Sequence, residues 1–155
     1  MRYIALLRGI NVGRHKKFPK TEQLKMLKGL GFQDGQVYLH TGNWIFNSSE
    51  SRNQVASKIE NEITNVYGWE VPVLVLKASE IEQILMDCPF SNLPDGEEGE
   101  TKVKRYFILL KTEPTAEKIS TVKKIRYPKE KFHITATCVY YYCSTGYGQA
   151  KLSGT

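Results

Sequence analysis

The order of its apolar runs is the feature that most limits how this chain can fold. Residues 3–8 form an apolar run with little alternation, which predicts a strand covered on both faces. A basic stretch with two glycines follows, and leucines then recur at helical spacing, at Leu24, Leu27 and Leu30. We expect Thr21 or a near neighbour to cap this helix and Gly31 to end it in the left-handed conformation.

A predicted hairpin and a second helix continue the pattern. Two short β-prone runs, 37–39 and 44–46, are separated by turn-forming residues, which predicts a hairpin. Ser48, Ser49 and Ser51 can cap the helix that follows. Its apolar residues recur every three or four positions, at Val55, Ile59, Ile63 and Val66, and Gly68 closes it. The run 71–76 predicts a strand that completes the order βαββαβ, and its early proline favours an edge position or a strand beginning.

The same order then begins again. A short helix from Ser79 to Met86 and an acidic loop rich in proline and glycine separate the two copies. The second copy is predicted as a strand at 103–110, a helix at 115–124, and strands at 131–135 and 138–143. Residues 149–152 have the pattern of a first helical turn, so the second copy is expected to lack its final helix and strand.

The repeated order predicts an α+β fold of two tandem ferredoxin-like (βαββαβ) subdomains with antiparallel sheets. The first subdomain is expected at 1–77, a connecting helix and acidic loop at 78–100, and the incomplete second subdomain at 101–155. In residues 44–46 and 139–142, neighbours that point to opposite faces are all apolar or aromatic. Both faces of each sheet therefore need cover, and the two sheets are expected to cover one another.

Composition narrows the class of protein. The 155 residues are 41% hydrophobic and 25% charged, as in folded globular domains. No apolar run approaches the roughly 20 residues of a membrane-spanning helix, and the start of the chain lacks a secretory cleavage pattern. Cys88, Cys138 and Cys143 are an odd number without metal-binding spacing, so we read them as reduced core thiols. A cytoplasmic protein without a membrane partner is expected.

Two motifs resemble a known family. Residues 1–13, MRYIALLRGINVG, and 38–46, YLHTGNWIF, resemble the family called domain of unknown function 1697, and residues 146–152, GYGQAKL, are similar to its late G-x-G-x-S-K-L element. The resemblance covers essentially the whole chain and implies two ferredoxin-like subdomains, but no assigned chemistry. The chain departs from the family pattern at Arg14, His15 and Lys16, where similar proteins have a glycine and a lysine-asparagine pair. Similar proteins also continue beyond the late element.

The best candidate site is the glycine-bearing loop after the first strand. Arg8, Gly9, Asn11 and Gly13 follow a strand end and precede a helix, an arrangement in which N–H groups and a guanidinium can converge on a phosphate or carboxylate. The spacing is neither the dinucleotide fingerprint nor the P-loop. The competing interpretation is structural: the glycines permit a tight turn, Asn11 caps it, and Arg8 pairs with a core carboxylate.

A second motif can join the same site. Residues 41–43 suit a hairpin turn, but their polar side chains can also line a groove with the first motif. The full set predicted to bind a ligand is Arg8, Gly9, Asn11, Gly13, Thr41, Gly42, Asn43 and Lys151. His15, His40 and His133 lack ligand spacing, so neither a metal nor a cofactor is predicted, and no catalytic arrangement stands out.

Two alternatives remain open. The net charge of +6 favours anionic partners, and a nucleic-acid binding module would use Arg14, Lys16, Lys17, Lys123, Lys124 and Arg126. The basic-glycine-aromatic signature of RNA-recognition modules is not met by residues 42–47. The other alternative is a structural or partner-binding domain without a ligand. The favoured hypothesis is a protein that binds an anionic small molecule, and whether it is an enzyme is left open.

Overall fold

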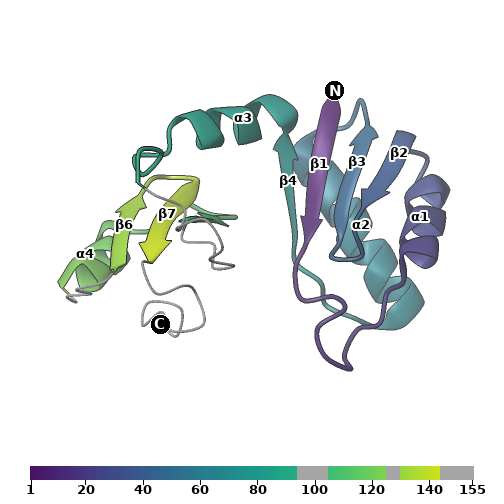
Figure 1. Cartoon of the computed structure of the whole chain (residues 1–155). Helices are drawn as coiled ribbons and strands as arrows, with labels where there is room; N and C mark the ends of the chain where they lie inside the picture. Colours follow the sequence, from purple (N-terminus) through teal and green to yellow (C-terminus); the bar gives the residue numbers. More distant parts are fainter. Residues whose placement is uncertain (94–104, 125–129, 144–155) are drawn as a thin grey trace, which may run out of the picture. The chain divides into compact units, whose positions relative to one another are not determined.

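The computed structural model describes residues 1–93, 105–124 and 130–143. The chain is an α+β protein, and the described ranges hold four helices and two antiparallel sheets. It divides into two compact units, Met1–Gln83 and Ile84–Thr155, which we describe separately (Figure 1).

The first unit has the βαββαβ order that the sequence predicts. Its elements are β1 (Arg2–Leu7), α1 (Lys20–Gly29), β2 (Gln33–Tyr38), β3 (Asn43–Asn47), α2 (Arg52–Tyr67) and β4 (Val73–Lys77). The antiparallel sheet has the strand order β2-β3-β1-β4, with α1 and α2 on one of its faces (Figure 1). β4 is an edge strand and begins directly after Pro72, in agreement with the prediction from that proline.

Strand alternation builds the core of this unit. Tyr3, Ala5 and Leu7 of β1 are buried, whereas Ile4 and Leu6 between them are half-buried. The buried positions of β1 face the helices, which contribute apolar side chains in turn. From α1 and α2 these are Met26, Leu27, Val55, Ile59 and Ile63. Val66, predicted in this series, is instead exposed, because the buried stripe of α2 continues through Tyr67, four residues after Ile63.

The start of α1 differs from the prediction, and its end agrees with it. Thr21 lies inside the first turn, and Pro19 in an extended conformation precedes the helix without a side-chain cap. Thr21 is not the cap because the helix already begins at Lys20, after Pro19, whose ψ of 153° is extended. Gly31 has the predicted left-handed φ of 78°, and its N–H donates to the carbonyl of Lys28 at 3.1 Å.

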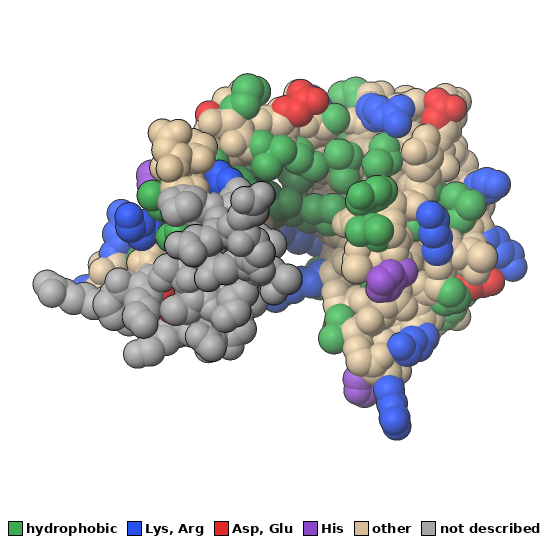
Figure 2. All heavy atoms as spheres, in the orientation of Figure 1, with side chains coloured by type: hydrophobic (Ala, Val, Ile, Leu, Met, Phe, Trp, Pro, Cys, Tyr) green, Lys and Arg blue, Asp and Glu red, His purple; other side chains and the backbone are tan. Residues whose placement is uncertain are grey.

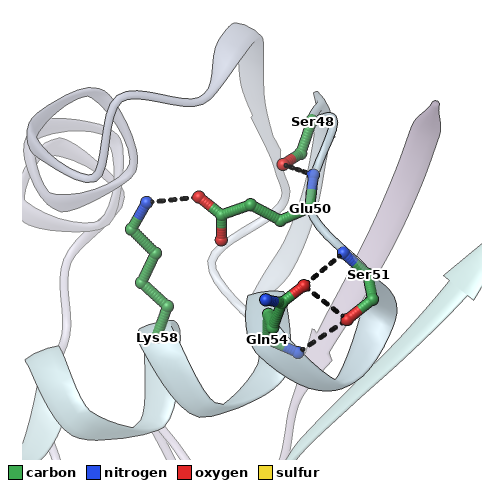
Figure 3. A network of polar contacts seen from close by, with 5 residues as sticks. All are labelled: Ser48, Glu50, Ser51, Gln54 and Lys58. Atoms are coloured by element: carbon green, nitrogen blue, oxygen red, sulfur yellow. Dashed lines mark hydrogen bonds and ion pairs between the residues drawn. The ribbon is translucent and has the colours of Figure 1, made fainter.

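The start of α2 carries a capping box (Figure 3). The backbone N–H of Gln54 donates to Ser51 Oγ at 3.4 Å, and the N–H of Ser51 donates to Gln54 Oε1 at 2.9 Å. Nearby, Lys58 Nζ and Glu50 Oε1 form an ion pair at 2.7 Å on the surface. Gly68 ends the helix with a φ of 69°, so both predicted ends of α2 are confirmed.

β2 begins four residues before the predicted run. Its register shifts between Gln33 and Gln36, where Asp34 has a φ of 52°. A Cβ at Gly35 would lie 2.9 Å from Leu27 Cδ2, so a larger residue here would require the buried Leu27 side chain to shift. Because the register is irregular and the residues are polar, this part of the strand has no alternating apolar pattern that would predict it from the sequence.

The second unit holds a three-stranded sheet. Its described elements are β5 (Arg105–Leu109), α4 (Ala116–Lys124), β6 (Glu130–Ile134) and β7 (Cys138–Cys143), and α3 (Ala78–Met86) spans the boundary between the units. The antiparallel order is β5-β7-β6. A small core contains Ile84, Cys88, Cys138 and Tyr140. The helical turn predicted at 149–152 lies outside the described residues.

Candidate functional site

Three loops meet at one end of the first sheet, which we call the loop end: residues 8–19, 39–42 and 68–72 (Figure 1). Strand pairing brings them together, because the end of β1 lies beside the starts of β3 and β4. The N–H of Leu7 donates to the carbonyl of Gly42 at 2.9 Å, and the N–H of Arg8 donates to that of Pro72 at 3.0 Å. The two motifs that the sequence singles out therefore lie next to each other.

The side chain of Asn11 ties the first loop to the hairpin turn. Its Nδ2 donates to the carbonyls of Phe18 at 2.8 Å and of His40 at 2.6 Å. Its Oδ1 accepts from the N–H of Phe18 at 2.8 Å. The amide thus uses both donors and one acceptor within the protein, which is the structural role that the competing interpretation gave it.

A buried glutamine extends this network, and it is not among the residues predicted from the sequence. Gln23 is fully buried, and its Nε2 donates to the carbonyls of Phe18 at 2.7 Å and of His40 at 3.1 Å. Trp44 Nε1 donates to Gln23 Oε1 at 2.8 Å. Buried polar groups need such partners, and here they fix the loop end against the core. The sequence signal for Gln23 is its position on the face of the predicted helix that carries the leucines.

The hairpin turn is held by its own residues. Asn43 Nδ2 donates to the carbonyl of Tyr38 at 3.2 Å and to Thr41 Oγ1 at 2.9 Å. Gly42 has a φ of 89°, and a Cβ there would lie 2.8 Å from both Leu7 Cβ and Ile10 Cδ1. The turn accounts for these contacts, and a ligand-binding role for Thr41, Gly42 and Asn43 stays a prediction.

Arg8, Gly9 and Gly13 are predicted site residues that are exposed in the first loop. Arg8 is exposed, and within residues 1–93, 105–124 and 130–143 its guanidinium has no ion-pair or hydrogen-bond partner. The core carboxylate pairing considered for Arg8 is therefore not found there. Gly9 and Gly13 have φ of 77° and 56°, and the space beside each Cα is open. A ligand can approach the backbone at both glycines.

Left-handed backbone conformations concentrate at the loop end. Most described residues with positive φ lie in its three loops, the exceptions being Gly31 and Asp34. Three of those at the loop end are not glycine: Asn11, Lys16 and Leu39. Such conformations cost on the order of 1–3 kcal/mol each and are found more often at functional sites than elsewhere. The strain therefore marks this end as the part of the first unit to test for function.

Positive charge gathers at the same end. Arg14, His15 and Lys17 are exposed, and Lys16 Nζ donates to the carbonyl of Glu70 in the third loop. In Figure 2, Lys, Arg and His side chains mark the lower tip of the first unit, where the loops lie. Of the other predicted basic residues, Lys123 and Lys124 are exposed at the end of α4 in the second unit. Arg126 and Lys151 lie outside the described residues.

The three cysteines are free and buried. Burial, together with the nearby Cys88, raises the pKa of Cys138 to about 11, so this thiol stays protonated and is a poor nucleophile at neutral pH. The described residues contain no group of three His, Cys, Asp or Glu side chains placed to hold a metal ion. Nor does any helix among them have the length and apolar character needed to cross a bilayer.

Fold and loop end together define an α+β protein with antiparallel sheets and a basic, glycine-bearing loop after its first strand. The family described as "Protein of unknown function (DUF1697)" matches residues 1–140, and the chain belongs to this family. Its fold is similar to that of the conserved bacterial protein SP0830 from Streptococcus pneumoniae, with 26% sequence identity and a TM-score of 0.69. The similarity covers 92% of this chain and 77% of that chain. A comparison with curated protein sequences gave no match.

Proposed function

We propose that this chain binds a small molecule carrying a phosphate or carboxylate group at the loop that follows β1. The observation that carries the proposal is the Arg8 guanidinium, exposed at a strand end and without a partner among the described residues. An arginine can form a two-pronged, charge-assisted hydrogen bond with such an anion.

The backbone beside Arg8 supports the same ligand. Among the described residues, the N–H groups of Gly9 and Gly13 donate to no protein acceptor. Gly9 and Gly13 also have left-handed φ angles, a conformation that occurs in the backbone nests that bind anions. In this proposal Arg8, Gly9 and Gly13 contact the ligand, and Asn11, Thr41, Gly42 and Asn43 shape the loops around them. Lys151 is kept in the predicted set on sequence grounds alone.

A thermal-shift titration with inorganic phosphate and pyrophosphate tests this function. A ligand that binds the folded state raises its melting temperature. We expect a rise for the natural chain and a much smaller one for Arg8→Gln, since a hydrogen bond to a charged group contributes about 1.5–3 kcal/mol, or at least tenfold in affinity.

Lys25→Gln is the matched control, because Lys25 is an exposed cation of α1 away from the loop and its loss changes the net charge equally. Equal responses from the two variants would mean that only overall charge is sensed and that Arg8 is not the anion-binding residue.

Nucleic acid is a second candidate because Arg14 and Lys17 are exposed in the same loop, and Lys123 and Lys124 are exposed in the second unit. Binding through phosphate contacts releases counterions, so its affinity falls steeply as salt rises. A pocketed small anion has a much weaker salt dependence. A filter-binding series with single-stranded oligonucleotides from low to moderate salt separates the two functions.

We further propose that both halves are ferredoxin-like and that the protein works in the cytoplasm. The strand order β2-β3-β1-β4 of the first unit supports the fold, and β5-β7-β6 in the second unit repeats its β1-β3-β2 part with α4 in the place of α1. Three free thiols support a reducing compartment.

A further inference from the structure

We infer that the loop end docks on an anionic lipid surface. This inference goes beyond the proposed small-anion site, and it does not depend on Arg8 binding a ligand. The sequence alone predicted no membrane partner, but that expectation came from the lack of a spanning segment, and docking on a surface needs none.

Exposed apolar side chains lie in adjoining segments at the loop end. Val12 in the first loop is 64% exposed, Leu39 in the hairpin turn is 53% exposed, and Tyr38 beside it is 62% exposed. The hydrogen bond from Asn11 Nδ2 to the carbonyl of His40 joins the immediate neighbours of Val12 and Leu39, so the two apolar side chains belong to adjoining loops. Single exposed apolar residues are ordinary, but a group of them beside one another is not.

Leu39 is the least expected of the three. Its φ of 59° is a conformation that turns normally fill with glycine or asparagine, and a bulky side chain disfavours it. Neither the turn nor contact with solvent explains a leucine at this position. An apolar partner for its side chain does.

The charge around these side chains identifies the partner. Between residues 8 and 20 the chain has five Lys or Arg and no acidic residue, and Glu70 is the single acid of the third loop. Arg14 and Lys17 are exposed in the first loop. Apolar side chains surrounded by cations suit a bilayer. The apolar side chains enter the acyl boundary, and the cations stay among the anionic headgroups. Loop tips that project from the end of a sheet also suit a flat partner better than a peptide, which needs a groove (Figures 1 and 2).

Vesicle co-sedimentation of the full chain tests the inference. We expect binding to vesicles of mixed phosphatidylcholine and phosphatidylglycerol, and little binding to phosphatidylcholine alone. Leu39→Asn is the decisive variant, because asparagine accepts a left-handed φ and the turn should fold as well or better. It should lower the partition coefficient about tenfold through the lost apolar contact. Lys17→Ala should lower it about fivefold.

Leu85→Asn is the matched control, since Leu85 is also exposed, at 54%, but lies on α3, outside the three loops of the loop end. It should bind vesicles as the natural chain does. Full binding by Leu39→Asn, or equal binding to neutral and anionic vesicles, would overturn the inference. So would displacement from vesicles by millimolar inorganic phosphate or by polyglutamate, since these outcomes assign the surface to a free anion or to an acidic protein.

Discussion

Asn11 shows how one side chain decides the shape of the loop end. Three hydrogen bonds from its amide group join the backbone at Phe18 and at His40, which belong to different loops. Asn11 itself has a φ of 55°, a conformation that asparagine accepts more readily than most residues. Asn11, which the sequence predicts as a ligand contact, therefore fixes the shape of the loop that carries Arg8.

We predict that Asn11→Ala lowers the free energy of unfolding of the first unit by about 2–3 kcal/mol. The substitution leaves the N–H of buried Phe18 without its acceptor and loses both donated bonds. Urea denaturation followed by tryptophan fluorescence measures the loss, because Trp44 and Trp69 both lie in this unit. Asn43→Ala is the comparison, and its cost should be below about 1 kcal/mol, since its bonds lie in an exposed turn. A cost for Asn11→Ala no larger than this would contradict the role given to its side chain.

At the scale of single elements, α2 has the strongest local signals. Ser51 at its start, an apolar residue at every fourth position and Gly68 at its end are all visible in the sequence, and all three are present in the structure. The same kinds of signal failed at the start of α1, where a proline took the position before the helix, and in β2, where a register shift broke the alternation.

We predict that Ser51→Ala lowers the free energy of unfolding by about 1 kcal/mol, the usual cost of losing a helix cap. Both arms of the capping box depend on this serine and on Gln54 (Figure 3). Chemical denaturation measures the loss. Ser49→Ala is the control, because Ser49 is exposed and makes no side-chain hydrogen bond within the described residues, so its cost should be close to zero. Equal costs would mean that the cap contributes nothing in solution.

At the scale of the whole molecule, the sequence predicts the α+β class and the restart of the element order, because both follow from local periodicity. It does not predict which of the site residues already form hydrogen bonds within the protein. The bonds of Asn11 reach Phe18 and His40, and those of Gln23 reach Trp44, so they depend on how distant segments meet. Leu39 was missed for a similar reason, since a turn pattern does not reveal which residue takes the left-handed conformation.

The buried thiol of Cys138 makes stability depend on pH. Its pKa is raised from 9.0 to about 11 in the folded state, chiefly by burial, so the unfolded chain loses this proton at lower pH than the folded chain does. This contribution is fully present below about pH 9 and is lost as pH rises toward 11, where the free energy of unfolding should have fallen by roughly 2 kcal/mol.

Cys138→Ala should remove that part of the pH dependence. Urea denaturation of both proteins between pH 8 and about pH 11 measures it, and groups common to both cancel in the comparison. The same slope in both proteins would mean that Cys138 ionises equally in the folded and unfolded states.

The most direct test of the account is whether the backbone at Gly9 and Gly13 contacts an anion. Two-dimensional ¹⁵N–¹H NMR spectra recorded during titration with pyrophosphate follow each amide separately. We predict that the largest saturable shifts occur at Gly9 and Gly13 and that they are lost in Arg8→Gln but kept in Lys25→Gln. Saturable shifts confined to other parts of the chain, or unchanged in Arg8→Gln, would contradict an anion site at this loop.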